Sequence, residues 1–326
     1  MGNSDLYVCG YGANILLTHV NNIEEEINCV ERHDDIEHIH RLRVATRRIH
    51  STLSIFHDYL QFKNQENWQV SFEILRKSLG TARDLDVKIN LVDSIINHMA
   101  DKKYLPGIIR LNLRLNQKRI RQQSVVIQTL EMLKKKNSIK KLKSNCTEFL
   151  NMQKTNPIFS NSIYQLSEEN ISSYYSRMIK FEPFIYQPDC LDEIHALRIG
   201  IKRLRYAVET FSPLYPDVIL PTLKILRTAQ DFLGEIHDCD LWVDDIQNFI
   251  IKEQKRVLIF YGNSRPYKRL EPGITFFLQE RKDYRNKVYQ EFITGWDIWR
   301  KENIFDNLLD TVHRYVVKNS YKLSDR

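Results

Sequence analysis

The strongest constraint on the fold is a segment that the chain carries twice. Residues 40–59 read HRLRVATRRIHSTLSIFHDY, and residues 195–214 read HALRIGIKRLRYAVETFSPL. Four basic positions of the first copy match four of the second at one constant offset. The matched pairs are His40 with His195, Arg43 with Arg198, Arg47 with Lys202, and His50 with Arg205. An internal repeat of this kind predicts two copies of one structural unit.

Both copies have the spacing of an amphipathic helix. At about 100° per residue, the matched basic residues of each copy fall within an arc of roughly 80°. The apolar residues lie on a separate arc; they are Leu42, Ile49, Leu53 and Phe56 in the first copy, and Leu197, Leu204, Val208 and Phe211 in the second. A solvated helix face usually mixes Lys and Arg with Glu, whereas these basic arcs contain no carboxylate. Each copy therefore predicts a helix with a buried apolar face and a basic face that binds an anion.

The repeated segments are part of a pattern of four motifs. Two have the forms H-x-x-R-V-x-x-R-R and L-R-x-x-I-K-R-L-R-Y-A-x-E-x-F, and the other two are LGTARDLDV from Leu79 and LGEIHDCDL from Leu233. In this order they resemble the CHAD domain, the conserved-histidine α-helical domain, over almost the whole chain. The sequence departs from the usual pattern of that family at His50, Cys239 and Leu241. The resemblance implies an all-α domain that binds inorganic polyphosphate and is found on polyphosphate granules.

Composition agrees with a helical protein that holds reduced thiols. The 326 residues include only 10 Gly and 9 Pro, and 42% are hydrophobic, so the chain can bury a substantial core. The five Cys are odd in number and lack a C-x-x-C pair, which is typical of reduced thiols and not of disulfides or a zinc site. No run of about 18 apolar residues is present. We expect a cytoplasmic protein without a cofactor or a membrane partner.

Helical periodicity predicts two halves joined by a polar linker. Residues 153–162 are polar and lack periodicity, so we expect the linker there. The prediction is one elongated all-α domain over 1–326, with a first half over about 1–155 and a second half over about 163–320. Each half is expected to resemble a four-helix bundle. A pseudo-two-fold relation between the halves would bring the two basic faces together in a central groove.

Several local signals predict where helices end or bend. Residues 33–35 (HDD) offer a break and N-cap candidates before the first basic helix, which we expect to extend to about Tyr59. Gly80 and Gly234 interrupt long helical patterns, and each predicts a kink or a close backbone approach. Residues 262–272 are expected to form a loop.

The balance of charge favours an anionic partner. The formal net charge is +7 and the pI is near 9.0, which leaves nucleic acid, polyphosphate, acidic lipid and acidic protein open. Residues 110–143 contain eleven Lys or Arg against Glu131 alone. Arg binds phosphate oxygens through two parallel N–H bonds, Lys offers a point charge, and His gains charge near neutral pH. The predicted polyphosphate-binding residues are His40, Arg43, Arg47, Arg48, His50, Arg83, Arg110, Arg114, Lys118, Arg121, His195, Arg198, Lys202, Arg203 and Arg205.

Two D-x-D pairs accompany the basic segments. They are Asp84 with Asp86 and Asp238 with Asp240. One interpretation is that these carboxylates orient the arginines, and the other is that they coordinate Mg²⁺ near phosphate. D-x-D is common by chance, so the first interpretation is favoured and no metal site is predicted.

A metal-dependent hydrolase is the main alternative. His237 and Asp238, with His195 and Asp244, could imitate the metal site of an HD-type phosphohydrolase that acts on a phosphate ester or on polyphosphate. The counterpart of His237 in the first half is Arg83, however, and a guanidinium is not a metal ligand. This asymmetry argues against a catalytic site built from the repeat.

Two further observations favour a binding protein. A second His-Asp pair, His33-Asp34, has no counterpart in the second half. Aromatic residues are sparse in the basic arcs, which argues against a nucleic-acid-binding helical protein. The sequence therefore predicts non-catalytic binding of polyphosphate by a granule-targeting or recruiting module. A separate polyphosphate- or triphosphate-processing enzyme is a further expected partner.

Overall fold

The chain folds entirely into helices where its structure is described. The structure is a computed structural model that describes residues 5–32, 36–62, 65–155, 160–215 and 218–324. These residues form ten α-helices and three short 3₁₀ helices, and they contain no strand. The all-α prediction is therefore confirmed. None of the helices in these ranges is long and apolar enough to cross a membrane.

The first half contains five helices. They are α1 (Leu6–Arg32), α2 (Ile36–Ile55), α3 (Gln65–His98), α4 (Leu105–Lys135) and α5 (Ser138–Thr155). α1 packs on α2 and α5, and α3 packs on α2 and α4. The first copy of the repeat forms α2, which ends at Ile55 and not at about Tyr59; the residues that follow Ile55 form a turn.

The second half has the same number of α-helices. They are α6 (Ser162–Ile179), α7 (Leu191–Phe211), α8 (Leu220–Tyr261), α9 (Glu271–Lys301) and α10 (Ile304–Ser324). Here α6 packs on α7 and α10, and α8 packs on α7 and α9. Each half thus has five α-helices instead of the four of a simple bundle. The second half also has three 3₁₀ helices: η1 (Glu182–Phe184), η2 (Ser212–Leu214) and η3 (Arg265–Arg269). The predicted loop at 262–272 contains η3 and the start of α9.

The apolar faces of the two repeated helices pack as the sequence predicts. The eight apolar residues of the two arcs are all buried, and Phe56 and Phe211 are completely inaccessible to solvent. These two matched phenylalanines contact each other, with ring centroids 5.9 Å apart. Burying a Phe side chain stabilises a fold by about 1.5–3 kcal/mol. This contact therefore fixes the end of α2 against the end of α7.

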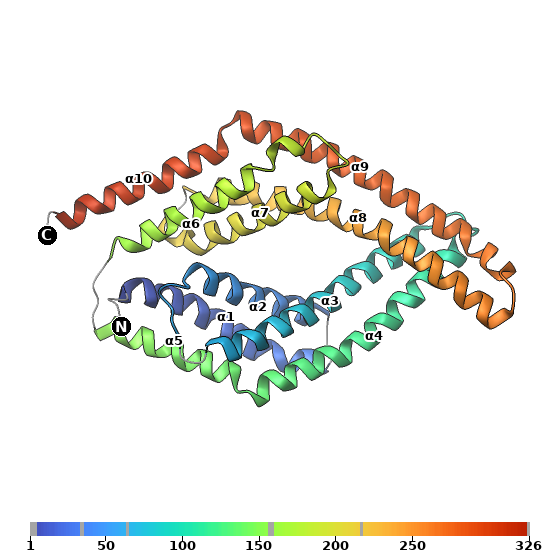
Figure 1. The fold of residues 1–326 in the computed structure, drawn as a ribbon, viewed down its shortest axis with the longest axis horizontal. Coiled ribbons are helices and arrows are strands. Elements are labelled where there is room, and N and C mark those ends of the chain that lie inside the picture. Colours follow the sequence, from blue (N-terminus) through green and yellow to red (C-terminus); the bar gives the residue numbers. More distant parts are fainter. Residues whose placement is uncertain (1–4, 33–35, 63–64, 156–159, 216–217, 325–326) are drawn as a thin grey trace.

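The two halves meet again at the far end of the molecule. Figure 1 shows the first half in blue to green and the second in yellow to red, with α4 and α9 converging on one side. A Cβ atom at Gly107 would lie 2.1 Å from the Leu270 carbonyl oxygen, and one at Gly273 would lie 1.9 Å from the Tyr104 carbonyl oxygen. Only glycine permits backbones to approach this closely.

The glycines inside α3 and α8 do not have the predicted close backbone neighbours. Both helices run without interruption through Gly80 and Gly234. A Cβ atom at Gly80 would have the Arg43 Nε as its nearest neighbour outside the helix, at 3.9 Å, and one at Gly234 would have nothing within 4 Å. Among the described residues, no other backbone approaches closely at either glycine.

Two predicted features fall wholly or partly outside the described residues. The cap candidates at 33–35, which include His33 and Asp34, lie between α1 and α2 in the part that is not described. The predicted linker agrees with the gap between α5 and α6, although its residues 156–159 also lie outside the described ranges.

Candidate polyanion-binding site

The structure brings cations of the two repeats close to one another. Arg43 and Arg47 come from α2, and Arg198 and Lys202 come from α7, which packs on α2. We call these four residues the central cluster. Burial lowers the pKa of Lys202 to about 8, and the positive charges of Arg198, Arg47 and Arg43 act in the same direction. Cations of both halves therefore share one electrostatic environment.

Arg47 and Arg198 of the central cluster are partly buried, and each has a nitrogen without a hydrogen-bond acceptor in the described part of the chain. Burial, with a contribution from Arg43, lowers the pKa of Arg47 to about 10, and burial also lowers the pKa of Arg198. The Nε atoms of Arg47 and Arg198 are buried and have no hydrogen-bond partner among the described residues. Cations held together in this way repel one another. A bound anion would reduce this repulsion and stabilise the cluster.

Only the first aspartate of each D-x-D pair lies near the central cluster. Asp84 is 65% exposed and its Oδ1 lies 3.8 Å from an Arg43 nitrogen. Burial raises the pKa of Asp238, whereas the neighbouring Arg198 acts to lower it and Asp84 to raise it. Asp86 instead binds Arg119 of α4 at 2.6 Å. Asp240 likewise accepts a hydrogen bond from Arg285 of α9.

The second aspartates therefore each join a pair of helices. Asp86 joins α3 to α4, and Asp240 joins α8 to α9. The Mg²⁺ interpretation also lacks a ligand set: in the ranges that the structure describes, no group of three or more His, Cys, Asp or Glu is placed to hold a metal ion.

His40 and His195 lie at the start of the two basic faces. Burial lowers the pKa of His40, and the charge of Arg83 adds to this effect. Burial and Arg198 likewise lower the pKa of His195. The Nδ1 atoms of His195 and His237 are 3.1 Å apart, and burial lowers the pKa of His237 to about 4. In all three rings burial therefore lowers the pKa below the usual value for histidine and favours the neutral form.

The remaining basic positions of the motif region lie around the central cluster. Arg83 forms an ion pair with Glu37 at 3.3 Å. Partial burial, and then the positive charge of Arg76, lowers the pKa of His50, with a smaller effect of the same sign from Arg203. Arg203 is exposed. Of these three predicted residues, His50 and Arg203 are exposed and Arg83 is half-buried.

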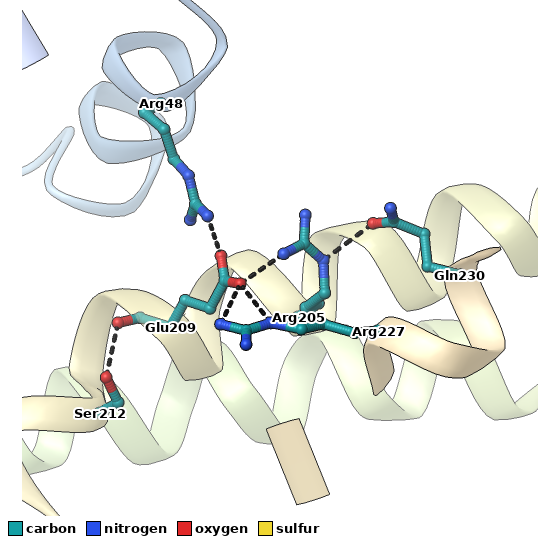
Figure 2. Close-up of polar contacts among 6 residues, drawn as sticks. All are labelled: Arg48, Arg205, Glu209, Ser212, Arg227 and Gln230. Atoms are coloured by element: carbon teal, nitrogen blue, oxygen red, sulfur yellow. Dashed lines mark hydrogen bonds and ion pairs between the residues drawn. The ribbon is translucent and has the colours of Figure 1, made fainter. Parts of the chain in front are cut away.

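Arg48 and Arg205, two of the predicted ligand residues, form ion pairs with one carboxylate. Figure 2 shows the Glu209 carboxylate of α7 in ion pairs with Arg48 of α2, Arg205 of the same helix and Arg227 of α8. Arg205 also donates its Nε–H to Gln230 at 2.9 Å, and the Glu209 side chain is only 9% exposed. Arg48 therefore ties the first half to the second at this carboxylate, and Arg205 binds it from the same helix.

A tyrosine completes this contact. The ring of Tyr206 has the guanidinium carbon of Arg205 4.6 Å from its centroid, that of Arg48 at 4.9 Å and that of Arg47 at 5.1 Å. Cations are attracted to the face of an aromatic ring. Tyr206 thus lies between the Glu209 network and the central cluster.

A cavity of about 920 Å³ lies on the Glu209 side of α2, between α1, α2, α7 and α8. Its lining includes both cations and carboxylates, among them His19, Arg48, Glu25 and Glu209. Burial lowers the pKa of His19 to about 4. This mixed lining suits a polyanion less well than the central cluster does.

The basic stretch of α4 divides into paired and accessible residues. Arg114 binds Glu253 of α8 through Nε and Nη2, both at 2.9 Å, and Arg110 reaches the same carboxylate at 3.3 Å. Glu253 is 1% exposed, so these arginines neutralise a buried charge between the halves. Lys118 and Arg121 are exposed on α4.

Some residues of the site were missed from the sequence. Arg76 of α3 acts on both Lys202 and His50. Its spacing from Gly80 and Arg83 places all three on one face of a helix, which is a signal that the sequence contains. Lys88, whose ammonium lies 5.1 Å from the Trp242 ring centroid, gives no such signal.

The fold and the site define a class: an all-α protein, with ten α-helices in its described ranges, whose centre carries cations from a repeated helix. The family profile described as "CHAD domain" matches residues 14–247. The chain therefore belongs to the CHAD domain family, as the four motifs predict.

Solved structures show the same fold. One is the crystal structure of the CHAD domain from the plant Ricinus communis, which is 22% identical, with a TM-score of 0.65 and coverage of 88% of this chain and 91% of that chain. Another is PptA from Streptomyces chartreusis, which is 13% identical, with a TM-score of 0.57 and coverage of 89% and 99%. Comparison with curated protein sequences gives no match.

Proposed function

We propose that this chain binds inorganic polyphosphate at the central cluster without catalysing its hydrolysis. One observation carries the proposal: matched cations of two helices lie together, and only Asp84 among the described residues is within ion-pair distance of them. Polyphosphate is the ligand that family membership suggests. A linear polyanion would receive Arg forks from both α2 and α7 along its length.

The structure narrows the set of residues that the proposal assigns to the ligand. Arg43, Arg47, Arg198 and Lys202 form the primary contact, and His40, His50, Arg83, His195 and Arg203 surround it. Lys118 and Arg121 of α4 would extend the surface for a long chain. Arg48, Arg205, Arg110 and Arg114 are assigned to holding the fold, because Glu209 and Glu253 occupy them.

The proposed groove would lie between two halves related by a pseudo-two-fold axis. The repeated order of packing partners and the contact between matched Phe56 and Phe211 support this relation. A polyphosphate chain has similar chemistry in both directions, so equivalent faces can bind successive phosphates. Such a module would recruit the protein to granules or present the polymer to a separate phosphate-processing enzyme.

Binding can be tested with the purified full chain and long-chain polyphosphate, using RNA and DNA as competitors. The variant Arg47→Gln/Lys202→Gln should bind at least about tenfold more weakly, since a hydrogen bond to a charged group contributes about 1.5–3 kcal/mol. The matched control Lys135→Gln/Lys140→Gln removes two exposed charges elsewhere and should bind within about twofold of the parent. Equal losses in both variants would contradict a specific site.

Catalysis needs a separate measurement. Incubation with polyphosphate or nucleoside triphosphates and Mg²⁺ or Mn²⁺ should release no more phosphate than the His237→Ala/Asp238→Ala variant. Metal-dependent turnover that this double change abolishes would favour the HD-type hydrolase instead.

A further inference from the structure

The last turn of α8 exposes an unusual run of large apolar side chains. Leu258, Ile259, Phe260 and Tyr261 are 53%, 73%, 80% and 53% exposed. Gly262 then ends the helix with φ of 69°, and its N–H donates to the Leu258 carbonyl oxygen at 2.9 Å. Four consecutive helical residues point in all directions around the axis. The last turn of α8 therefore exposes apolar side chains in several directions, Ile259 and Phe260 most of all.

The position of this turn separates it from the central cluster. In Figure 1 the end of α8 and the start of α9 lie at the right-hand end of the molecule, opposite both chain ends. Ile251, one of the exposed residues further back on α8, is 66% exposed. Contiguous apolar surface of this kind on a soluble fold usually marks an interaction site.

Basic residues surround the apolar turn. Between 251 and 270 the sequence has six Lys or Arg, all exposed: Lys252, Lys255, Arg256, Arg265, Lys268 and Arg269. Glu253 is the one carboxylate of this segment, and it is buried and bound by Arg110, Arg114 and Arg256. The exposed charged side chains of residues 251–270 are therefore all positive.

We propose that this tip, residues 251–269, docks on the surface of an anionic lipid membrane. The apolar turn would enter the boundary between headgroups and acyl chains, and the surrounding cations would face the lipid phosphates and carboxylates. The sequence expectation of no membrane partner considered spanning segments, whereas this contact needs none.

Two other occupants fit the surface less well. A soluble polyanion would use the cations but leave Ile259 and Phe260 in water. A second copy of the chain would cover the apolar turn, but it would place like charges opposite each other. An anionic bilayer satisfies both the apolar and the basic parts of the tip.

Sedimentation of the full chain with vesicles tests the proposal. The parent should bind vesicles of phosphatidylcholine mixed with phosphatidylserine and should bind phosphatidylcholine alone at least about tenfold more weakly. Ile259→Ser/Phe260→Ser should reduce binding to the mixed vesicles by about tenfold or more. The control Ile120→Ser, which changes a residue of α4 that is 72% exposed, should leave it unchanged.

Two further measurements separate the membrane contact from polyphosphate binding and from self-association. Ile259→Ser/Phe260→Ser should retain the polyphosphate affinity of the parent, and Arg47→Gln/Lys202→Gln should retain the vesicle affinity. Vesicle binding that is lost with the central cluster, or that is unaffected by the tip variant, would overturn the proposal. A parent protein that does not bind vesicles would also overturn the proposal. If that protein forms a concentration-dependent dimer that the tip variant abolishes, the tip binds a second copy of the chain instead.

Discussion

The pKa of Lys202 shows how the central cluster affects a single residue. Its ammonium group is partly buried beside Arg198, Arg47 and Arg43, and burial followed by these charges lowers its pKa to about 8. The group is therefore close to losing its proton at mildly alkaline pH. A bound polyanion would stabilise the protonated form.

This residue gives the proposed binding a pH dependence. Because the ligand favours protonated Lys202, affinity should be complete below a pH of about 8 and should fall as pH rises towards about 9.5. Lys202→Arg keeps the charge over this range and should remove most of the decrease. Titration of the two proteins with polyphosphate at about pH 7 and about pH 9.5 provides the comparison. Equal decreases would show that Lys202 does not contact the ligand.

Individual residues also show what the sequence could not predict. Arg205 lies on the second basic arc and Arg48 follows Arg47 of the first, so both are predicted to bind the ligand, but Glu209 binds both. Glu209 lies on the same helix as Arg205, yet its contact with Arg48 depends on how α7 packs against α2. Helical periodicity identifies a face and does not identify the residue opposite it.

At the scale of the helices, the Glu209 network is the main polar contact between α2, α7 and α8. Its carboxylate receives three guanidinium groups while its side chain is 9% exposed. Removing one partner of a buried ion pair leaves uncompensated charge, which costs more than loss of an exposed pair.

Glu209→Gln should therefore lower the free energy of unfolding by about 2–4 kcal/mol. Urea unfolding followed by circular dichroism measures this change. The control Glu291→Gln removes a carboxylate that is 49% exposed and 3.9 Å from Lys287, and it should change stability by less than about 0.5 kcal/mol. Similar effects of the two substitutions would contradict the role assigned to Glu209.

The glycines distinguish a helix crossing from open space. Gly107→Ala would place Cβ 2.1 Å from the Leu270 carbonyl oxygen, so it should destabilise the fold by about 1–3 kcal/mol. Gly234→Ala meets nothing within 4 Å and should be neutral or stabilise the helix by up to about 1 kcal/mol. Thermal unfolding of both variants tests the crossing of α4 and α9. A neutral Gly107→Ala would contradict it.

The sequence predicts helices well where helical periodicity extends over a long stretch. It does not predict backbone geometry that depends on residues distant in the sequence. The two basic helices and their buried faces were found because Leu42, Ile49, Leu197 and Leu204 repeat at helical spacing. The crossing at Gly107 and Gly273 could not be found, because it joins residues far apart in the sequence. Gly80 and Gly234 show the same limit: among the described residues, neither has the close backbone neighbour that was one of the two predicted alternatives, because a glycine signals available space without showing what occupies it.

For the whole molecule, the central claim is that two repeated helices act as one binding site. Packing of α2 on α7 is shown by the contact of Phe56 with Phe211 at 5.9 Å. The shared electrostatic environment is shown by the effect of Arg43 and Arg47 on Lys202. Duplication predicted two cationic faces, and the folded chain places cations from both at its centre.

The most direct test compares the two halves of the central cluster. Arg43→Gln/Arg47→Gln and Arg198→Gln/Lys202→Gln each remove two charges from one helix, and each should weaken polyphosphate binding to a similar extent, by about tenfold or more. Each variant should also reduce the slope of affinity against salt, because fewer phosphates are neutralised. Calorimetric titration at several salt concentrations measures both quantities. Loss of binding in one variant, with parental affinity and salt dependence in the other, would contradict a site shared by the two repeats.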